Sequence, residues 1–285
     1  MLTATVWFSM LLQQSAFPSA PPAPIWGVTL DDLTYVGSIK KSLGAFKKKV
    51  TARVVFDPGM HPADYLPALK TLGTTAYLMG EPVDSYDAAT YTPSAYRARM
   101  AEFMDGVGSF VSIWEVGNEV NGDWTGKVSD QVARITAGVQ EAQKRKRPTA
   151  LTLFYSDDFL GTNREMVTWS NKYLGATLRS QFDYVLVSFY PTSATAKHPN
   201  WPTIFTNLAK AFPNAKLGFG ELGLANPDGS LSTSQSGKTA LIQRYYPMTP
   251  PISNRYIGGY FWWNFAEDAV PTTRALWSVF DGCIR

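Results

Sequence analysis

The sequence predicts an α/β protein, a single-domain (β/α)₈ barrel of the TIM type, from three observations. The chain has 285 residues, and a barrel of this type needs roughly 250. Eight short apolar or aromatic runs have the character of strands, and the stretches between them can each hold the crossover helix that parallel strands require. No glycine-rich phosphate-binding motif follows any of these runs, so an open nucleotide-binding sheet gains no support.

The N-terminal segment is set apart from the rest by its composition. An apolar run from Leu2 to Leu12 precedes a stretch rich in proline and alanine that ends at Pro24. The run is too short to span a bilayer but has the length of a signal-peptide core. Because no Lys or Arg precedes it, an unstructured extension is the alternative. We expect residues 1–24 to be a signal peptide and Pro-rich linker, residues 25–285 to form the barrel, and the protein to be secreted or periplasmic.

The strands are expected where β-branched, aromatic and other apolar residues are concentrated between turn and helix signals. Such runs recur from Ile25 onward, and their starts lie 23 to 42 residues apart. The expected strands are 25–30, 51–56, 74–79, 110–116, 150–155, 183–190, 216–221 and 258–265.

Two helices in the first half of the chain have clear start signals. Pro62 begins a helix that runs to about Leu72 and ends at Gly73. Pro93 begins a second helix that runs to about residue 107. Proline is favoured at the first position of a helix because its missing N–H would be unpaired there in any case. Both helices therefore fill gaps between expected strands.

Three more helices are expected in the second half. Ser129 is a candidate cap for a helix that ends in the basic run 144–147, where cations stabilise the helix dipole. This position makes a solvated helix end a better explanation of the run than a nucleic-acid patch. Thr233 or Ser234 can cap a later helix. A short helix over 272–280 is expected to close the chain.

Composition excludes several classes of protein and site. Hydrophobic residues make up 45% of the chain and charged residues 17%, which rules out a disordered chain, a coiled coil and a collagen-like fibre. A net charge of +3 predicts no strong attraction for nucleic acid or acidic membranes. With one cysteine, Cys283, and two histidines, His61 and His198, the chain lacks an internal disulfide, a thiolate metal cluster and a three-histidine site. We expect no metal and no cofactor.

Carboxylates are concentrated at the ends of the expected strands, where barrels of this type carry their chemistry. Asp32 and Asp158 have an ordinary explanation, because Asp caps helices and forms turns. Glu is a poor residue for turns and strand interiors. Glu115, Glu119 and Glu221 nevertheless lie in or at the end of strongly apolar strands, and a carboxylate there is costly unless it is paired or used.

The ends of three expected strands carry a resemblance to a known group of enzymes. Asn118 and Glu119 end the fourth strand, and Glu221 ends the seventh. The eighth contains Trp262 and Trp263 followed by Asn-Phe-Ala. An Asn-Glu pair on strand four with a Glu on strand seven resembles the clan A retaining glycoside hydrolases. The Trp-Asn-Phe-Ala segment looks like the corresponding strand of β-galactosidases and β-glucuronidases. About six residues carry this resemblance, which covers the whole barrel.

The resemblance implies a role for each matching residue. Glu119 would be the general acid/base, and Glu221 the nucleophile that forms a glycosyl-enzyme intermediate. Asn118 would bind the 2-hydroxyl of the sugar. Arg53 would keep Glu221 negatively charged, and Tyr190 would donate a hydrogen bond to it. In this setting the aromatic surroundings of Glu119 would raise its pKa.

Further candidates and alternatives concern the side chains around this pair. Trp263 would form the floor of the site, with Trp262 as the second choice, and Glu81 and Trp124 are additional substrate-binding candidates. Arg53 could instead pair with another strand-end carboxylate, Asp31 or Glu81. Tyr190 could be an ordinary strand-end aromatic. Glu115 is expected to be a buried structural partner. Several families carry a His where this chain has Ser188, so no single family matches throughout.

The substrate is limited by charge and by loop length. Few charged residues are available to neutralise an acidic polymer, which favours a neutral β-linked polysaccharide. Short loops and the lack of an extra domain favour endo-acting cleavage. We also expect a monomer with no nucleic-acid or membrane partner. The alternatives are a carbohydrate-binding barrel without activity and a barrel hydrolase or lyase of another chemistry. Retained Glu119 and Glu221 argue against the first, and the scarcity of histidine argues against the second.

Overall fold

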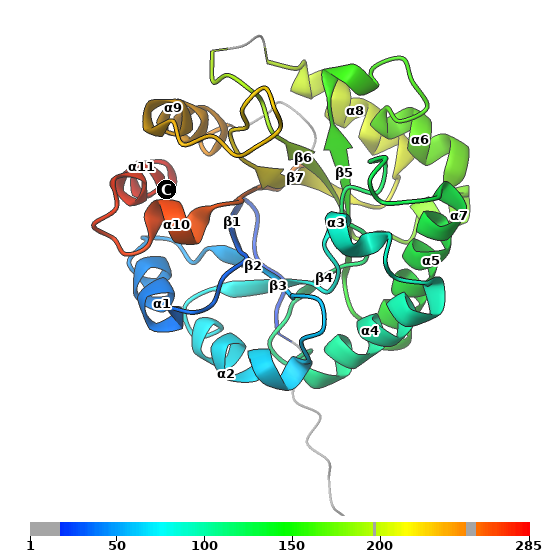
Figure 1. Ribbon diagram of the computed structural model, residues 1–285, viewed down its shortest axis with the longest axis horizontal. Coiled ribbons are helices and arrows are strands. Elements are labelled where there is room, and N and C mark those ends of the chain that lie inside the picture. The colour runs from blue at the N-terminus through cyan, green and yellow to red at the C-terminus, as the bar shows by residue number, and fades with distance from the viewer. Residues whose placement is uncertain (1–17, 196–197, 249–254) are drawn as a thin grey trace, which may run out of the picture.

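A computed structural model of the chain describes residues 18–195, 198–248 and 255–285. Eight parallel strands close into one barrel in the order of the sequence, and helices surround it (Figure 1). The predicted single-domain (β/α)₈ barrel is therefore confirmed. Most of the expected signal peptide, residues 1–17, lies outside the described residues. In the part of the chain that the structure describes, no helix is both long enough and apolar enough to cross a membrane.

The strands and helices alternate as the predicted fold requires. The strands are β1 Ile25–Leu30, β2 Thr51–Val55, β3 Tyr77–Glu81, β4 Ile113–Glu115, β5 Thr149–Tyr155, β6 Tyr184–Phe189, β7 Lys216–Leu222 and β8 Gly258–Trp262. The helices are α1 Val36–Gly44, α2 Pro62–Leu72, α3 Ser85–Ala88, α4 Pro93–Gly106, α5 Val128–Lys144, α6 Met166–Tyr173, α7 Ala176–Arg179, α8 Trp201–Ala211, α9 Gln235–Tyr245, α10 Phe265–Ala269 and α11 Ala275–Cys283, with a 3₁₀ turn at Asp157–Phe159.

Several expected boundaries need correction. The third strand begins at Tyr77, because the hydroxyls of Thr74 and Thr75 hydrogen-bond back to the last carbonyls of α2 and extend its end. Glu81 therefore lies inside β3 and not after it. Helix α5 begins after Lys127, so Ser129 lies within its first turn and does not cap it.

The C-terminal boundaries also differ from the prediction. Strand β8 ends at Trp262, because the chain turns into the short helix α10 at Phe265. The final helix runs from Ala275 to Cys283, three residues later than expected.

Residues along each strand alternate between the barrel interior and the surrounding helices. The outward side chains join the helices in the main core. A separate apolar cluster fills the lower part of the interior, toward the N-terminal ends of the strands: Ile25, Met79, Ile113, Ala150, Tyr184, Leu186, Ile257 and Phe261. On several strands, the inward-facing residue two positions after a member of this cluster is polar, as Glu81 is after Met79 and Glu115 after Ile113. The functional groups therefore lie at the C-terminal end of the barrel.

Candidate active site

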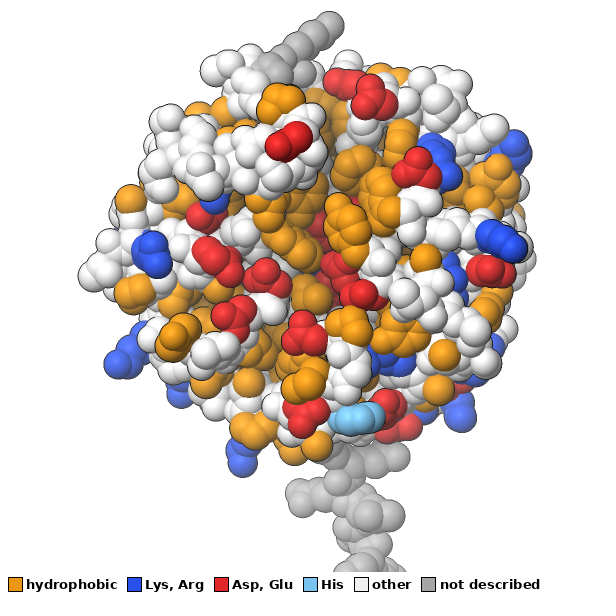
Figure 2. Space-filling view, viewed as in Figure 1, with side chains coloured by type: hydrophobic (Ala, Val, Ile, Leu, Met, Phe, Trp, Pro, Cys, Tyr) orange, Lys and Arg blue, Asp and Glu red, His pale blue; other side chains and the backbone are white. Residues whose placement is uncertain are grey.

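A pocket of about 370 Å³ opens at the C-terminal end of the barrel. Figure 2 shows acidic side chains gathered around the hollow on this face, while Lys and Arg lie mostly toward its edge. The pocket brings together residues from the ends of β3, β4, β5, β6, β7 and β8. Its lining includes Asp84, Ser85, Tyr86, Glu119, Trp124, Phe154, Tyr190, Glu221 and Trp263. The two glutamates singled out from the sequence therefore share one pocket.

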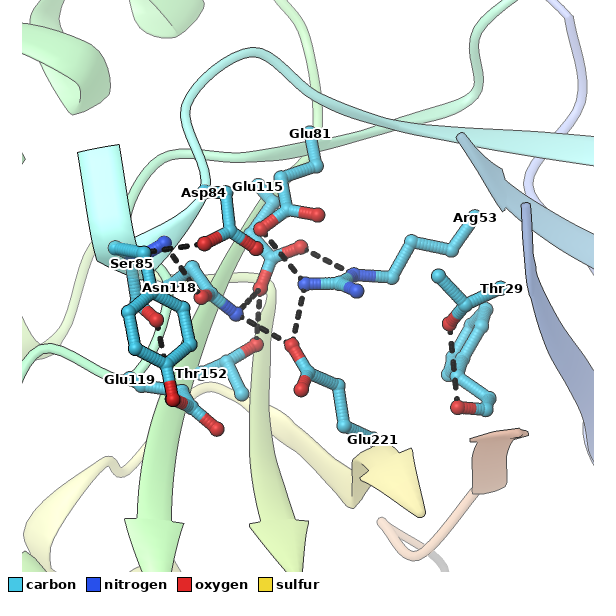
Figure 3. A network of polar contacts seen from close by, with 12 residues as sticks. Thr29, Arg53, Glu81, Asp84, Ser85, Glu115, Asn118, Glu119, Thr152 and Glu221 are labelled. Atoms are coloured by element: carbon cyan, nitrogen blue, oxygen red, sulfur yellow. Dashed lines mark hydrogen bonds and ion pairs between the residues drawn. The ribbon is translucent and has the colours of Figure 1, made fainter. Parts of the chain in front are cut away.

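Glu221 is held by three donors (Figure 3 shows two of them). Arg53 Nη2 lies 2.7 Å from Glu221 Oε1, and Asn118 Nδ2 donates to the same oxygen at 2.7 Å. The Tyr190 hydroxyl donates to Oε2 at 2.8 Å. Burial, followed by the charges of Glu221 and Glu119, raises the pKa of the Tyr190 phenol well above its ordinary value, so the hydroxyl remains a donor. Charge-assisted hydrogen bonds of this kind stabilise a carboxylate anion.

A β-bulge turns Glu221 into the barrel. Phe219 packs outward against Trp201 of α8, and strict alternation would send Glu221 the same way. The pairing of β6 with β7 shifts between Val187 and Ser188, so that Ser188 lies opposite Glu221. A bulge of one residue reverses the direction of the side chains that follow it. The interior position of Glu221 thus depends on this local irregularity.

Arg53 lies at the centre of a buried ion-pair cluster (Figure 3). Its Nε donates to Glu115 Oε2 at 2.6 Å, and its Nη2 lies 2.9 Å from Glu81 Oε1 as well as beside Glu221. Burial raises the pKa of the Glu81 carboxyl well above its usual range, against the opposing effect of Arg53. Oxygens of Glu81, Glu115 and Glu221 lie within 4.8 Å of one another. The Arg53 guanidinium forms ion pairs with all three of these carboxyl groups.

This cluster settles the alternatives for Arg53 and Glu115. Arg53 contacts Glu221 and Glu81 together, and its ion pairs among the described residues do not include Asp31, the third partner weighed from the sequence. Glu115 is a buried structural partner that also accepts hydrogen bonds from Thr152 and Asn118. The side chain of Glu81 is fully buried against Arg53. Its expected direct contact with substrate is therefore corrected: Glu81 lies beneath the pocket.

Glu119 has surroundings opposite to those of Glu221. It is buried, and the Ser85 hydroxyl donates to Oε2 at 3.1 Å. Burial raises the pKa of the Glu119 carboxyl well above its usual range, and the negative charge of Glu221 raises it further. The Glu119 backbone adopts φ +43°, a left-handed conformation that costs a non-glycine residue about 1–3 kcal/mol. Such strain is characteristic of functional sites.

Helix α3 contributes two residues that the sequence reading missed. Ser85 bonds to Glu119 through its hydroxyl and to Asn118 Oδ1 through its backbone N–H at 3.0 Å. Asp84 caps the helix through the N–H of Tyr86 and faces the pocket. Burial and the charge of Glu221 raise the pKa of Asp84 to about 6. An Asp-Ser pair signals a helix start, which predicts the helix but not its contact with β4.

The aromatic residues divide between the pocket and the outer core. Trp263 lines the pocket, with the Arg53 guanidinium 5.6 Å from its ring. Trp124 lines the opposite part, stacked on Tyr86 with ring centroids 6.2 Å apart. The expectation for Trp262 is corrected: it is 1% exposed and its indole N–H donates to Asp268. Alternation along β8 sends Trp262 outward and leaves Trp263 facing inward.

Comparison with known proteins supports the fold. No protein-family model matches the sequence, and no curated protein matches it. Among solved structures, the chain is similar to an endo-β-1,3-glucanase of family GH128 from Amycolatopsis mediterranei in complex with laminaripentaose. The TM-score is 0.59 at 11% identity, covering 91% of this chain and 99% of that one. It is also similar to xylanase A of P fluorescens subsp. cellulosa in complex with xylopentaose, with a TM-score of 0.60 at 14% identity over 88% and 91% of the two chains.

A third similar structure is larger. Saccharomyces cerevisiae Gas2 gives a TM-score of 0.57 at 12% identity over 91% of this chain. This chain spans 63% of the Gas2 chain, less than two thirds of its length. The two bacterial structures carry names of glycoside hydrolases, so the resemblance seen in the sequence is confirmed at the level of the fold.

Proposed function

We propose that this protein is a retaining glycoside hydrolase that cleaves a neutral β-linked polysaccharide within its chain. Glu119 acts as the acid/base and Glu221 as the nucleophile. The observation that carries this proposal is a single pocket containing two carboxyl groups in opposite surroundings. Glu221 accepts hydrogen bonds from Arg53, Asn118 and Tyr190. Glu119 is buried beside Ser85 with a raised pKa. An ionised nucleophile and a protonated acid are what the first step of retention requires.

In the first step, the Glu221 carboxylate attacks the anomeric carbon and forms an ester bond to the sugar. The bond from that carbon to the glycosidic oxygen breaks, and Glu119 transfers its proton to the departing oxygen. In the second step, Glu119, now ionised, removes a proton from water as the water attacks the same carbon and releases Glu221. Two inversions return the anomeric carbon to its original configuration.

Asn118 serves this chemistry first by orienting the nucleophile. Its Nδ2 donates to Glu221 at 2.7 Å and to Glu115 at 3.2 Å, while its Oδ1 accepts from the Ser85 N–H. Both amide hydrogens are thus engaged. An amide oxygen has two lone pairs, so Oδ1 can still accept a hydrogen bond from a sugar hydroxyl, consistent with the implied role in binding the 2-hydroxyl.

Charge in the pocket supports a neutral substrate. Among the described residues that line it are the three carboxyl groups of Asp84, Glu119 and Glu221, and none of the lining residues is Lys, Arg or His. A polymer of acidic sugars would be repelled there, since like charges brought together cost several kcal/mol. The stacked pair Tyr86 and Trp124 offers an apolar surface beside Glu119. That surface suits the sugar unit attached through the departing oxygen, as cleavage within a chain requires.

The proposal is tested with the wild-type protein and the variants Glu221→Gln and Glu119→Gln on laminarin, xylan, β-mannan, soluble cellulose and, as an acidic comparison, polygalacturonate. We expect the wild type to release reducing ends from a neutral polysaccharide with a rapid fall in viscosity. Each variant should lose at least about 10⁴-fold in kcat, because catalytic groups that act as a unit fail together. Glu102→Gln, an exposed residue on α4, is the matched control. Turnover by Glu221→Gln equal to that of the wild type would refute the assignment, and binding without cleavage by the wild type would favour the carbohydrate-binding barrel.

We also propose that the protein is exported, on the strength of the apolar run in the first 24 residues. N-terminal sequencing of the protein recovered outside the cytoplasm should show a start after the apolar run, between residue 13 and the first strand at Ile25. Recovery of the intact chain in the cytoplasm alone would contradict export.

A further inference from the structure

A second cavity, of about 400 Å³, opens at the same end of the barrel. One wall is formed by the segment after β1, including Asp32, Tyr35 and Ser38. The other is formed by the segment after β8, including Glu267 and Arg274. Both segments follow the C-terminal ends of neighbouring strands. The catalytic pocket lies at the same end of the barrel. No described residue lines both the cavity and the catalytic pocket.

The lining combines an exposed ring with both kinds of hydrogen-bonding group. Tyr35 is 72% exposed, among the most exposed large side chains of the described chain. Beside it, Asp32 and Glu267 offer acceptors, Arg274 offers donors and Ser38 can act as either. A sugar ring presents an apolar C–H face and a rim of hydroxyls, which an aromatic face and a few convergent polar groups can match.

Asp31 directly precedes the wall residue Asp32 but is not itself among the residues that line the cavity. Its Oδ1 is buried and has no hydrogen-bond partner among the residues that the structure describes. Burial and the charge of Glu267 raise the pKa of the Asp31 carboxyl to about 6. A buried acceptor without a partner loses the hydration it would have in water.

The cavity adjoins the catalytic pocket on the side of Trp263. Trp263 lines the catalytic pocket and Glu267 lines the cavity. Four residues of chain can separate their Cα atoms by at most about 14 Å. In the closed barrel β8 lies opposite β4, which carries Glu119 at its end. A polysaccharide that crosses the reaction centre from Glu119 toward Trp263 is therefore directed toward the side of the barrel where this cavity opens.

The direction of the chain follows from the chemistry. Glu119 protonates the oxygen that joins the two parts of the substrate, and the part that leaves extends past Glu119. The part that forms the ester with Glu221 extends the other way, past Trp263. We propose that the cavity between Tyr35 and Arg274 binds sugar units of that retained part, so that this site recognises chain length. The proposal rests on the proposed glycosidase function.

The test uses the inactive variant Glu221→Gln and oligosaccharides of three to six units from the polysaccharide that the wild type cleaves fastest. These are laminari-oligosaccharides for a β-1,3-glucan or xylo-oligosaccharides for xylan. Calorimetry gives the ratio of hexaose to triose affinity. Adding Tyr35→Ala should lower this ratio about tenfold, Arg274→Ala should lower it by a smaller factor, and Tyr35→Phe should retain it. Leu66→Ala, an exposed apolar change on α2, is the control.

Three results would overturn the proposal. The first is that Tyr35→Ala and the control Leu66→Ala have the same ratio of hexaose to triose affinity. The second is an equal loss of triose and hexaose affinity, which would indicate a structural defect. The third is binding of two hexaose molecules per protein, which would make the cavity a separate site. Failure of the wild type to cleave any of the neutral polysaccharides would instead refute the proposed function, so the two failures can be told apart.

Discussion

The lower and upper parts of the barrel interior are built on the same strands and differ completely in chemistry. Met79 and Ile113 belong to the lower apolar cluster. Two residues further along the same inward rows, Glu81 and Glu115 surround Arg53. A step of two residues therefore separates close-packed apolar side chains from a buried ionic cluster. In this fold the lower end serves stability and the upper end serves chemistry.

The comparison shows how a costly site is maintained. Each ion removed from water costs several kcal/mol even after relaxation, and only good pairing offsets this. Each apolar side chain buried below contributes about 1.5–3 kcal/mol. The lower cluster and the outer core thus stabilise a fold whose upper end holds carboxylates in surroundings that a stability-optimised protein would avoid. Substitutions in the lower apolar part should therefore change stability more than kcat, whereas substitutions in the upper polar part should also change kcat.

The largest effect on stability is expected from Arg53→Met. The change leaves Glu81, Glu115 and Glu221 buried together without their shared cation. Removing one partner of a buried ion pair costs about 3–5 kcal/mol, and here one cation serves three buried carboxyl groups. Urea unfolding monitored by circular dichroism measures the loss. A free energy of unfolding within about 1 kcal/mol of the wild type would contradict the central position of Arg53.

Ile25→Ala probes the lower layer. Ile25 is buried in the apolar cluster, at the first position of β1. Truncating a buried Ile to Ala costs about 2–5 kcal/mol of stability. The kcat measured well below the melting temperature should stay within a factor of two of the wild type. A large fall in kcat at a temperature where the variant is fully folded would mean that the lower apolar cluster also determines the geometry of the polar site above it.

Tyr190→Phe removes one donor from Glu221 without changing the shape of the ring. The lost bond is a hydrogen bond to a charged group, worth about 1.5–3 kcal/mol. We expect kcat to fall roughly 10- to 100-fold while the melting temperature changes little. Steady-state kinetics alongside thermal unfolding separate these effects, and a variant with unchanged kcat would make Tyr190 an ordinary strand-end aromatic.

Asp84→Asn should have the smallest effect, and one that depends on pH. The pKa of Asp84 is raised from 3.8 to about 6 in the folded protein, so folding favours its protonated form. The stability of the wild type therefore falls as pH rises from about 4 to 6. Asn still caps α3 but carries no charge, so the variant should gain about 1–3 kcal/mol at pH 7.5 and nothing near pH 3.5.

Urea unfolding at pH 3.5 and pH 7.5 measures this difference. An equal gain at both values would show that the effect does not come from the charge of Asp84.

The sequence predicted the barrel because strand periodicity, crossover lengths and helix caps all point the same way. It singled out Arg53, Tyr190 and Glu221, which the structure brings into contact. It could not predict the bulge that turns Glu221 inward, because a bulge depends on the pairing of β6 with β7. It missed Ser85 for a similar reason: the contact with Glu119 joins two strand ends that only the closed barrel brings together.

The uncertainty between Trp262 and Trp263 could have been reduced from the sequence. Successive strand residues face opposite sides, so only one of two adjacent tryptophans can face the interior. The parity of β8 is obscured, however, because Tyr260 and Phe261 both adopt positive φ. In the structure, side chains from Tyr260 to Trp263 still alternate between the outside and the inside of the barrel, which the sequence alone could not establish.

The central claim is that Glu119 and Glu221 perform a double displacement, and the configuration of the first-formed product tests it most directly. Proton NMR spectra recorded during the first minutes of cleavage of the best neutral β-linked polysaccharide show the anomeric signal before mutarotation. Two displacements at the same carbon predict that the new reducing end appears first as the β-anomer. Initial appearance of the α-anomer would mean a single displacement and would contradict the assignment of Glu221 as the nucleophile.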